Sequence, residues 1–297
     1  MNNLAPIVLF VYNRPEHTRK TIDALKKNQL AKESDLFIFS DGSKPGQEAR
    51  VQQVRKYIKG ITGFHNVSVI ERDKNWGLAN SVIAGVTEVV NKYGKVIVME
   101  DDLVCTSDFL QYMNHALEKY QNNQNVFSIT GFSHLTEQTA EGMPDTYFLK
   151  ICSSWSWATW KDKWGYFDPK ATGYRKLKWD LKQRKRFNFD NSYDFYSMLM
   201  EQMRKPTVVH IPFVARKKHI DSWAIRWYWS VFEQGGLTLF PRDSFVQNIG
   251  CDGSGVHCEA NNNMNNKIIS GRLDDNFIYE DVIEEQKWIR DRVKACI

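Results

Sequence analysis

The strongest constraint on the fold is a regular alternation of two kinds of segment over the first 130 residues. Apolar runs at 7–12, 36–40, 67–70 and 96–99 are each followed by a segment with helical periodicity, at 16–27, 47–59, 78–91 and 108–120. Buried parallel strands are continuous apolar runs, and strands that alternate with helices form right-handed βαβ units. We therefore predict an α/β fold with a mostly parallel central sheet flanked by helices.

The alternation breaks near residue 130, without a low-complexity linker. Short apolar runs at 127–130 and 147–151 predict further strands, and eight of the ten tryptophans lie between Trp155 and Trp229. A chain of 297 residues with 42% apolar residues can bury one large core. We predict a single domain, 1–297, whose first half is 1–130 and whose mixed second half is 131–297.

Charge and cysteine content exclude several classes of protein. A net charge of +5 is low for a dedicated nucleic-acid binder, and the chain has no Gly-x-x-x-x-Gly-Lys-Ser/Thr loop for a P-loop NTPase. Five irregularly spaced cysteines favour a reducing compartment. The apolar run at 7–12 is too short to span a membrane. We expect a cytoplasmic protein without a transmembrane helix.

Polar residues follow three of the predicted strands. Arg14 follows the first, Asp41 the second, and Glu100, Asp101 and Asp102 the fourth. Ligands of open parallel sheets bind beyond the carboxyl ends of the strands. Adjacent carboxylates repel one another, and a hard cation that also bridges phosphates, Mn²⁺ or Mg²⁺, relieves that repulsion. A solvated turn or a helix N-terminus would account for an isolated acidic triplet, but three polar strand ends together predict a metal and nucleotide site.

A family resemblance supports this interpretation. The segment from Val98 to Leu110, which contains Glu-Asp-Asp-Leu, is similar to the DXD-motif region of GT-A glycosyltransferases. It most resembles the form found in N-acetylglucosaminyltransferase I and bacterial glycosyltransferase-2-like proteins. Residues 11–14 and 40–43 resemble the first two strand ends of that family, and the similarity extends over about 6–257. The resemblance implies a Rossmann-like GT-A fold whose second half binds the acceptor.

The implied activity is metal-dependent, inverting transfer of a sugar from a nucleotide sugar, with UDP as the expected nucleotide, to a hydroxyl of a glycan or lipid-linked acceptor. By the same resemblance, Asp102 is the metal ligand, and Glu100 and Asp101 contact the ribose and donor sugar or orient the site. Arg14 helps to hold the nucleotide, and Asp41 contacts its uracil side. The implied biological role is bacterial polysaccharide or glycan assembly.

The second half supplies candidates for the remaining roles. Asp221 lies just before an apolar helical segment, and the resemblance assigns it as the general base. It could also be the N-cap of that helix, and the two roles can hold together. Asp252 is a second candidate base, and Asp180 is a weaker third. His257 follows a glycine turn, and the resemblance places it at the metal or the diphosphate. The spacing of the two cysteines that flank His257 is not that of a zinc finger.

Aromatic and basic residues suggest further contacts. We expect Trp155 and Trp157 to lie in a Ser-rich turn, where indole faces can stack on sugar rings, whereas we expect Trp160, Trp164 and Trp227 to pack in the core. Arg72 closes the third strand and is expected to line the donor pocket. The stretch 175–186 has seven basic residues and one acid. It is either a solvated helix face or a peripheral contact with an anionic membrane surface.

Two alternative functions remain open at this stage. A sugar-1-phosphate nucleotidyltransferase also has a nucleotide-binding parallel sheet, but its Gly-rich loop is absent after the first strand, where residues 12–16 are Tyr-Asn-Arg-Pro-Glu. A carbohydrate-binding protein on a decayed transferase fold would not need the acids that this chain retains at its strand ends.

Overall fold

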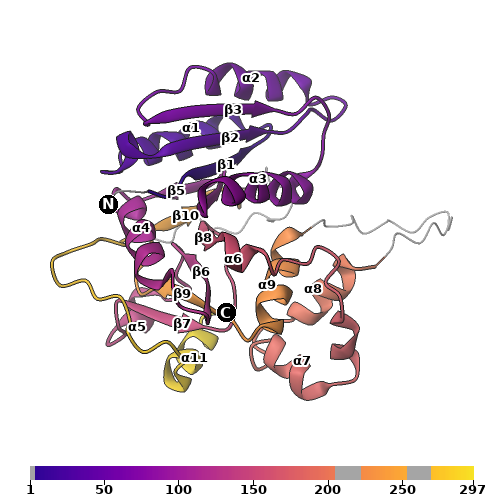
Figure 1. Cartoon of the computed structure of the whole chain (residues 1–297), viewed down its shortest axis with the longest axis vertical. Helices are drawn as coiled ribbons and strands as arrows, with labels where there is room; N and C mark the ends of the chain where they lie inside the picture. The colour runs from indigo at the N-terminus through magenta and orange to yellow at the C-terminus, as the bar shows by residue number, and fades with distance from the viewer. Residues whose placement is uncertain (1–3, 205–221, 253–268) are drawn as a thin grey trace.

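The computed structural model describes residues 4–204, 222–252 and 269–297. Within them, the first half of the chain alternates strands and helices as predicted (Figure 1). Its elements are β1 (Ile7–Val11), α1 (Pro15–Lys26), η1 (Ala31–Glu33), β2 (Asp35–Ser40), α2 (Glu48–Ile58), β3 (Asn66–Glu71), α3 (Leu78–Tyr93), β4 (Lys95–Glu100), β5 (Leu103–Cys105) and α4 (Phe109–Tyr120).

The second half is mixed, also as predicted. Its strands are β6 (Val126–Thr130), β7 (Thr146–Leu149), β8 (Trp157–Trp160), β9 (Leu237–Pro241) and β10 (Val246–Asn248). Its helices are α5 (Glu137–Ala140), α6 (Lys161–Trp164), η2 (Tyr174–Lys178), α7 (Leu181–Phe187), α8 (Phe195–Gln202), α9 (Trp223–Glu233) and α11 (Lys287–Lys294). None of the helices in the described part of the chain has the length and apolar character needed to cross a bilayer.

Eight strands form the central sheet, in the order β3-β2-β1-β4-β8-β6-β9-β7. The pairs β3–β2, β2–β1 and β1–β4 are parallel, which confirms the α/β prediction for the first half. Strand β8 pairs antiparallel with both β4 and β6, and so joins the parallel half to the mixed half within a single sheet. A second small sheet consists of β5 and β10, which pair antiparallel.

Both faces of the sheet are covered, because its buried strands present apolar side chains to each side. Along β1, Leu9 belongs to a core shared with α1, α2 and α4, and Phe10 to a core shared with α3 and α9. This two-sided burial accounts for the continuous apolar run of β1. It also leaves the strand ends as the place where polar groups of the first half can gather.

Candidate active site

The carboxyl ends of β1, β2 and β4 lie beside one another, since these parallel strands are neighbours in the sheet. Arg14 directly precedes α1, Asp41 directly follows β2, and Glu100 is the last residue of β4. The structure therefore places the predicted polar residues at one edge of the sheet, and it joins Arg14 to the acidic triplet by direct contacts.

A branched ion pair is the centre of this cluster. Arg14 Nη2 lies 2.5 Å from Asp101 Oδ1 and 2.8 Å from Asp102 Oδ2. The three side chains are only 16%, 6% and 14% exposed, respectively. The backbone N–H of Tyr12 also donates to Asp101 Oδ2. One guanidinium thus faces three successive acids, and the cluster keeps an excess of negative charge whenever all three are ionised.

The acids resist full ionisation because they are buried together. Burial, together with the negative charges of Asp102 and Asp101, raises the pKa of Glu100 to about 8. Arg14 and a hydrogen bond with the Trp223 side chain act in the opposite direction. Burial also raises the pKa of Asp101, although Arg14 partly offsets this. A bound cation would favour the charged forms of all three acids.

Two structural supports of the acidic turn were not predicted from the sequence. The backbone carbonyl of Asp101 accepts a 2.9 Å hydrogen bond from Thr21 Oγ1. The backbone carbonyl of Asp102 accepts a 2.8 Å hydrogen bond from the N–H of Ile249, just after β10. A Cβ atom on Gly250 would lie 2.2 Å from Asp102 Oδ2 and 2.9 Å from Arg14 Nη1. Only glycine therefore allows this loop to close over the ion pair, and Gly250 was the one sequence signal that could have revealed it.

Asp41 connects the end of β2 to the β3–α3 loop. Its Oδ1 accepts hydrogen bonds from the N–H groups of Gly42 and Trp76, at 2.9 and 2.8 Å, and its Oδ2 accepts one from Gly77 at 2.9 Å. The loop approaches so closely that a Cβ on Gly42 would lie 2.3 Å from the carbonyl carbon of Lys74. Asp41 therefore has a structural role, and its contact with a nucleotide base stays a prediction.

Arg72 lies at the end of β3 and stacks on an aromatic side chain. Its guanidinium carbon is 4.1 Å from the centroid of the Trp76 ring, and its backbone carbonyl accepts a 2.7 Å hydrogen bond from Arg55 Nη2. The Nε of Arg72 is buried and has no hydrogen-bond partner in the described part of the chain. An oriented guanidinium with an unused donor is suited to an anionic or carbonyl-bearing ligand. The predicted role of Arg72 at the donor pocket remains a proposal.

The two tryptophans predicted to contact sugars occupy different environments. Trp155 is half-buried and packs edge-on against Phe132. Trp157 lies on β8 rather than in a turn, is 0% exposed, and has ring centroids of Trp223 and Trp164 at 5.1 and 5.5 Å. The structure thus gives Trp157 a position in the core, and of the two tryptophans only Trp155 has surface with which to meet a ligand.

The remaining predicted residues lie in or near the parts not described. Asp221 and His257 both fall outside the described residues. The N-cap of α9 is Ser222, whose Oγ accepts a hydrogen bond from the N–H of Ile225. The other candidate base, Asp252, is 43% exposed, and its Oδ2 lies 3.1 Å from His17 Nε2. Asp180 caps α7, which gives it a structural role.

The acidic turn fits a divalent cation that is shared with a ligand. The described residues contain no group of three or more His, Cys, Asp or Glu side chains that could enclose a metal ion. In nucleotide sites, however, Mg²⁺ usually binds one or two carboxylates, and phosphate oxygens and waters complete its coordination. Asp101 and Asp102 supply such a pair, with an excess of negative charge.

Comparison with known proteins gives one extensive match. The family model described as "Glycosyl transferase family 2" matches residues 7–182, which contain β1 to β8 and the whole acidic cluster. No curated protein matches the chain. The narrower resemblance to N-acetylglucosaminyltransferase I is not confirmed by these comparisons.

Similar solved structures include TarS from S. aureus, with a TM-score of 0.33 and 14% identity over 43% of this chain and 21% of that one. A shorter form of TarS gives 0.33 and 15% over 43% and 34%. A mannosyltransferase from Pyrobaculum calidifontis, PcManGT, solved with GDP-Man and Mn²⁺, gives 0.36 and 10% over 53% and 44%. The matches thus span less than half the length of these proteins, and they carry no part of the argument below.

The raised pKa of Glu100 predicts an unusual pH dependence of stability for metal-free protein. Because its pKa rises from 4.5 to about 8 on folding, the wild type should lose stability as the pH increases between these values, by at most about 1.4 kcal/mol per pH unit. Glu100→Gln should lack this loss, so its advantage over wild type in EDTA should grow from pH 5 to pH 8.5. Denaturant unfolding measures this, with the exposed Glu88→Gln as control. Parallel pH profiles for all three proteins would contradict the prediction.

Proposed function

The chain belongs to glycosyl transferase family 2, and we propose that it transfers a sugar from a UDP-sugar donor to a hydroxyl group of a glycan or glycolipid acceptor. We further propose that the transfer depends on Mn²⁺ or Mg²⁺ and inverts the anomeric configuration. Family membership agrees with the GT-A type of α/β fold predicted from the sequence. The observation that carries the proposal is the buried cluster of Arg14, Asp101 and Asp102 at the carboxyl edge of the parallel strands.

The donor would lie across the ends of β1 to β4. Arg72, held against Trp76, has a free donor for the nucleotide, and the loop fixed by Asp41 forms the neighbouring wall. Arg14 holds Asp101 and Asp102 in place and lowers their mutual repulsion, so that both carboxylates remain available as acceptors. Ligands of open α/β sheets bind in this position.

The reaction needs charge stabilisation at the leaving diphosphate and removal of a proton from the acceptor. When bound, a divalent cation held by Asp102 would supply positive charge to the diphosphate. We assign the proton to Asp221, because an inverting transfer needs a carboxylate on the side of the sugar opposite the leaving group. Asp252 remains the alternative base.

The metal proposal predicts the effect of Asp102→Asn. This protein should fold but lose nearly all transfer and donor hydrolysis, because the carboxylate proposed to bind the cation is replaced by a weak neutral ligand. A screen of nucleotide sugars for hydrolysis, with and without Mn²⁺, identifies the donor for wild type and then compares the variants. Asp23→Asn, on the exposed face of α1, is the matched control. Full wild-type activity in EDTA together with an active Asp102→Asn protein would refute metal dependence.

The base proposal predicts that Asp221→Asn lowers turnover by about 10²–10⁴-fold while donor binding stays close to wild type. Calorimetry with the nucleotide measures binding, and steady-state transfer measures kcat. The wild-type product should have the inverted anomeric configuration by NMR. A larger loss of turnover in Asp252→Asn than in Asp221→Asn would move the role to Asp252, and a retained configuration would exclude both as bases of this reaction.

We also propose that the stretch 175–186 contacts an anionic membrane surface, where a lipid-linked acceptor would be presented. Trp179 is 80% exposed and Leu181 is 62% exposed, which is unusual for large apolar side chains. Lys178 and Lys182 are exposed beside them. The one acid of the stretch, Asp180, accepts a hydrogen bond from the backbone N–H of Gln183. Exposed aromatic and aliphatic side chains within a basic surface are typical of interfacial membrane contacts.

Vesicle co-sedimentation tests this contact. Vesicles that contain phosphatidylglycerol should retain the wild-type protein, and purely zwitterionic vesicles should not. Trp179→Ala should reduce binding several-fold, whereas alanine in place of Trp288, an exposed tryptophan on α11, should leave it unchanged. Equal binding by all three proteins, or binding that ignores lipid charge, would refute the proposed membrane contact.

A further inference from the structure

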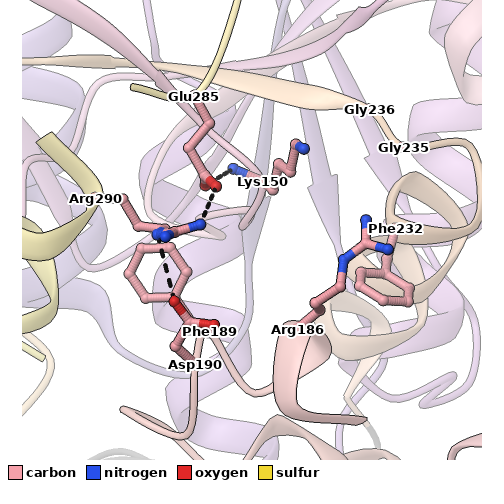
Figure 2. Close-up of a pocket in the computed structure, with 9 residues that line it drawn as sticks. All are labelled: Lys150, Arg186, Phe189, Asp190, Phe232, Gly235, Gly236, Glu285 and Arg290. Atoms are coloured by element: carbon pink, nitrogen blue, oxygen red, sulfur yellow. Dashed lines mark hydrogen bonds and ion pairs between the residues drawn. The ribbon is translucent and has the colours of Figure 1, made fainter. Parts of the chain in front are cut away.

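A pocket lies away from the strand ends, where β7, α7, the α9–β9 turn and the C-terminal segment meet (Figure 2). Its lining residues are Lys150, Arg186, Phe189, Asp190, Phe232, Gly235, Gly236, Glu285 and Arg290. Trp223 at the start of α9 contacts Glu100, whereas Phe232 near the other end of the same helix lines this pocket. A helix of 11 residues is about 16 Å long. The pocket is therefore separate from the proposed donor site.

One wall of the pocket is a network of paired charges. The side chain of Glu285 is only 6% exposed. Its carboxylate accepts a 2.8 Å hydrogen bond from the backbone N–H of Lys150 and lies 3.3 Å from Arg290 Nη1. Asp190 Oδ2 lies 3.4 Å from Arg290 Nε and 3.6 Å from Lys294 Nζ. Both carboxylates that line the pocket are thus already compensated by positive charges, and they do not neutralise further cations.

The turn that carries Asp190 has a specific backbone conformation. Phe189, Asp190 and Asn191 have φ values of 48°, 56° and 68°, in the left-handed region that residues with side chains rarely adopt. Phe189 is 3% exposed and belongs to the core, and Arg290 holds Asp190. Backbone conformations of this kind persist where the surroundings fix them. We expect this wall to be formed before any ligand binds.

Two cations in the pocket have no acidic partner. Neither Lys150 nor Arg186 forms an ion pair with a carboxylate among residues 4–204, 222–252 and 269–297, and both side chains are exposed to solvent. The guanidinium carbon of Arg186 lies 5.9 Å from the centroid of the Phe232 ring, which limits its position. Figure 2 shows the charged ends of Lys150 and Arg186 on the same side of the pocket.

From this arrangement we propose that the pocket binds a phosphate group, either free or carried by the acceptor. A guanidinium and an ammonium without acidic partners in the described part of the chain complement its charge, and a guanidinium can bind two phosphate oxygens at once. The cavity has a volume of about 60 Å³. This is several times the roughly 10–15 Å³ needed for one water, enough for a small anion but not for a nucleotide. The site would give the enzyme a second point of recognition, remote from the reacting atoms.

Titration calorimetry tests the proposal with inorganic phosphate and with glycerol phosphate as probes. Wild-type protein should bind inorganic phosphate saturably, and Lys150→Gln and Arg186→Gln should each weaken binding by about tenfold, the loss expected for one charge-assisted contact. Lys32→Gln, an equally exposed cation on η1 that lies outside both the pocket and the basic stretch, should change the affinity by less than twofold. All three residues are exposed, so each variant should fold; melting curves verify this.

The two probes distinguish the sources of phosphate. Glycerol phosphate that binds as tightly as inorganic phosphate, with the same sensitivity to Lys150→Gln, indicates a phosphate carried by a larger molecule. Binding of inorganic phosphate alone indicates the free ion. No saturable binding, or equal weakening by Lys32→Gln and Arg186→Gln, would overturn the proposal. These measurements need neither donor nor transfer, so their failure would leave the proposed function untouched.

Discussion

The negative charge at the end of β4 requires a positive charge close by, and Arg14 provides it. Three successive acids after a buried strand would repel one another and lose hydration without compensation. The contacts of Arg14 with Asp101 and Asp102 hold the start of α1 against the end of β4. The same requirement explains why Gly250 is needed, since any side chain there would displace the ion pair. The helix, the strand end and the covering loop are thus positioned around one charge interaction.

The first half of the chain could be predicted from the sequence because its determinants are local. Each buried strand is an apolar run, each helix has its own periodicity, and Arg14, Asp41 and the acids follow their strands directly. Parallel topology then brings these ends to one edge without further information. For the same reason, the family resemblance and the chemistry of the strand ends both indicated the cluster of Arg14 and the three acids.

The fold of the second half depends on pairings between segments that are distant in the sequence, and local patterns do not encode such pairings. The stretch around Trp157 contains serine and tryptophan and was expected to be a turn, yet it forms the strand between β4 and β6. Its burial follows from contacts with Trp164 and Trp223, which come from two other segments. The N-cap of α9 is Ser222, and the sequence alone could not identify it, because Asp and Ser at neighbouring positions are both good capping residues.

The pairing of β5 with β10 has a consequence for synthesis of the protein. A ribosome releases the chain from its N-terminus, so β1 to β4 can form their parallel sheet long before β10 emerges. During that interval the acidic turn has Arg14 but lacks the backbone N–H of Ile249 and the covering glycine. The nascent chain would therefore carry an acidic turn without its covering loop until residues 246–250 have been synthesised.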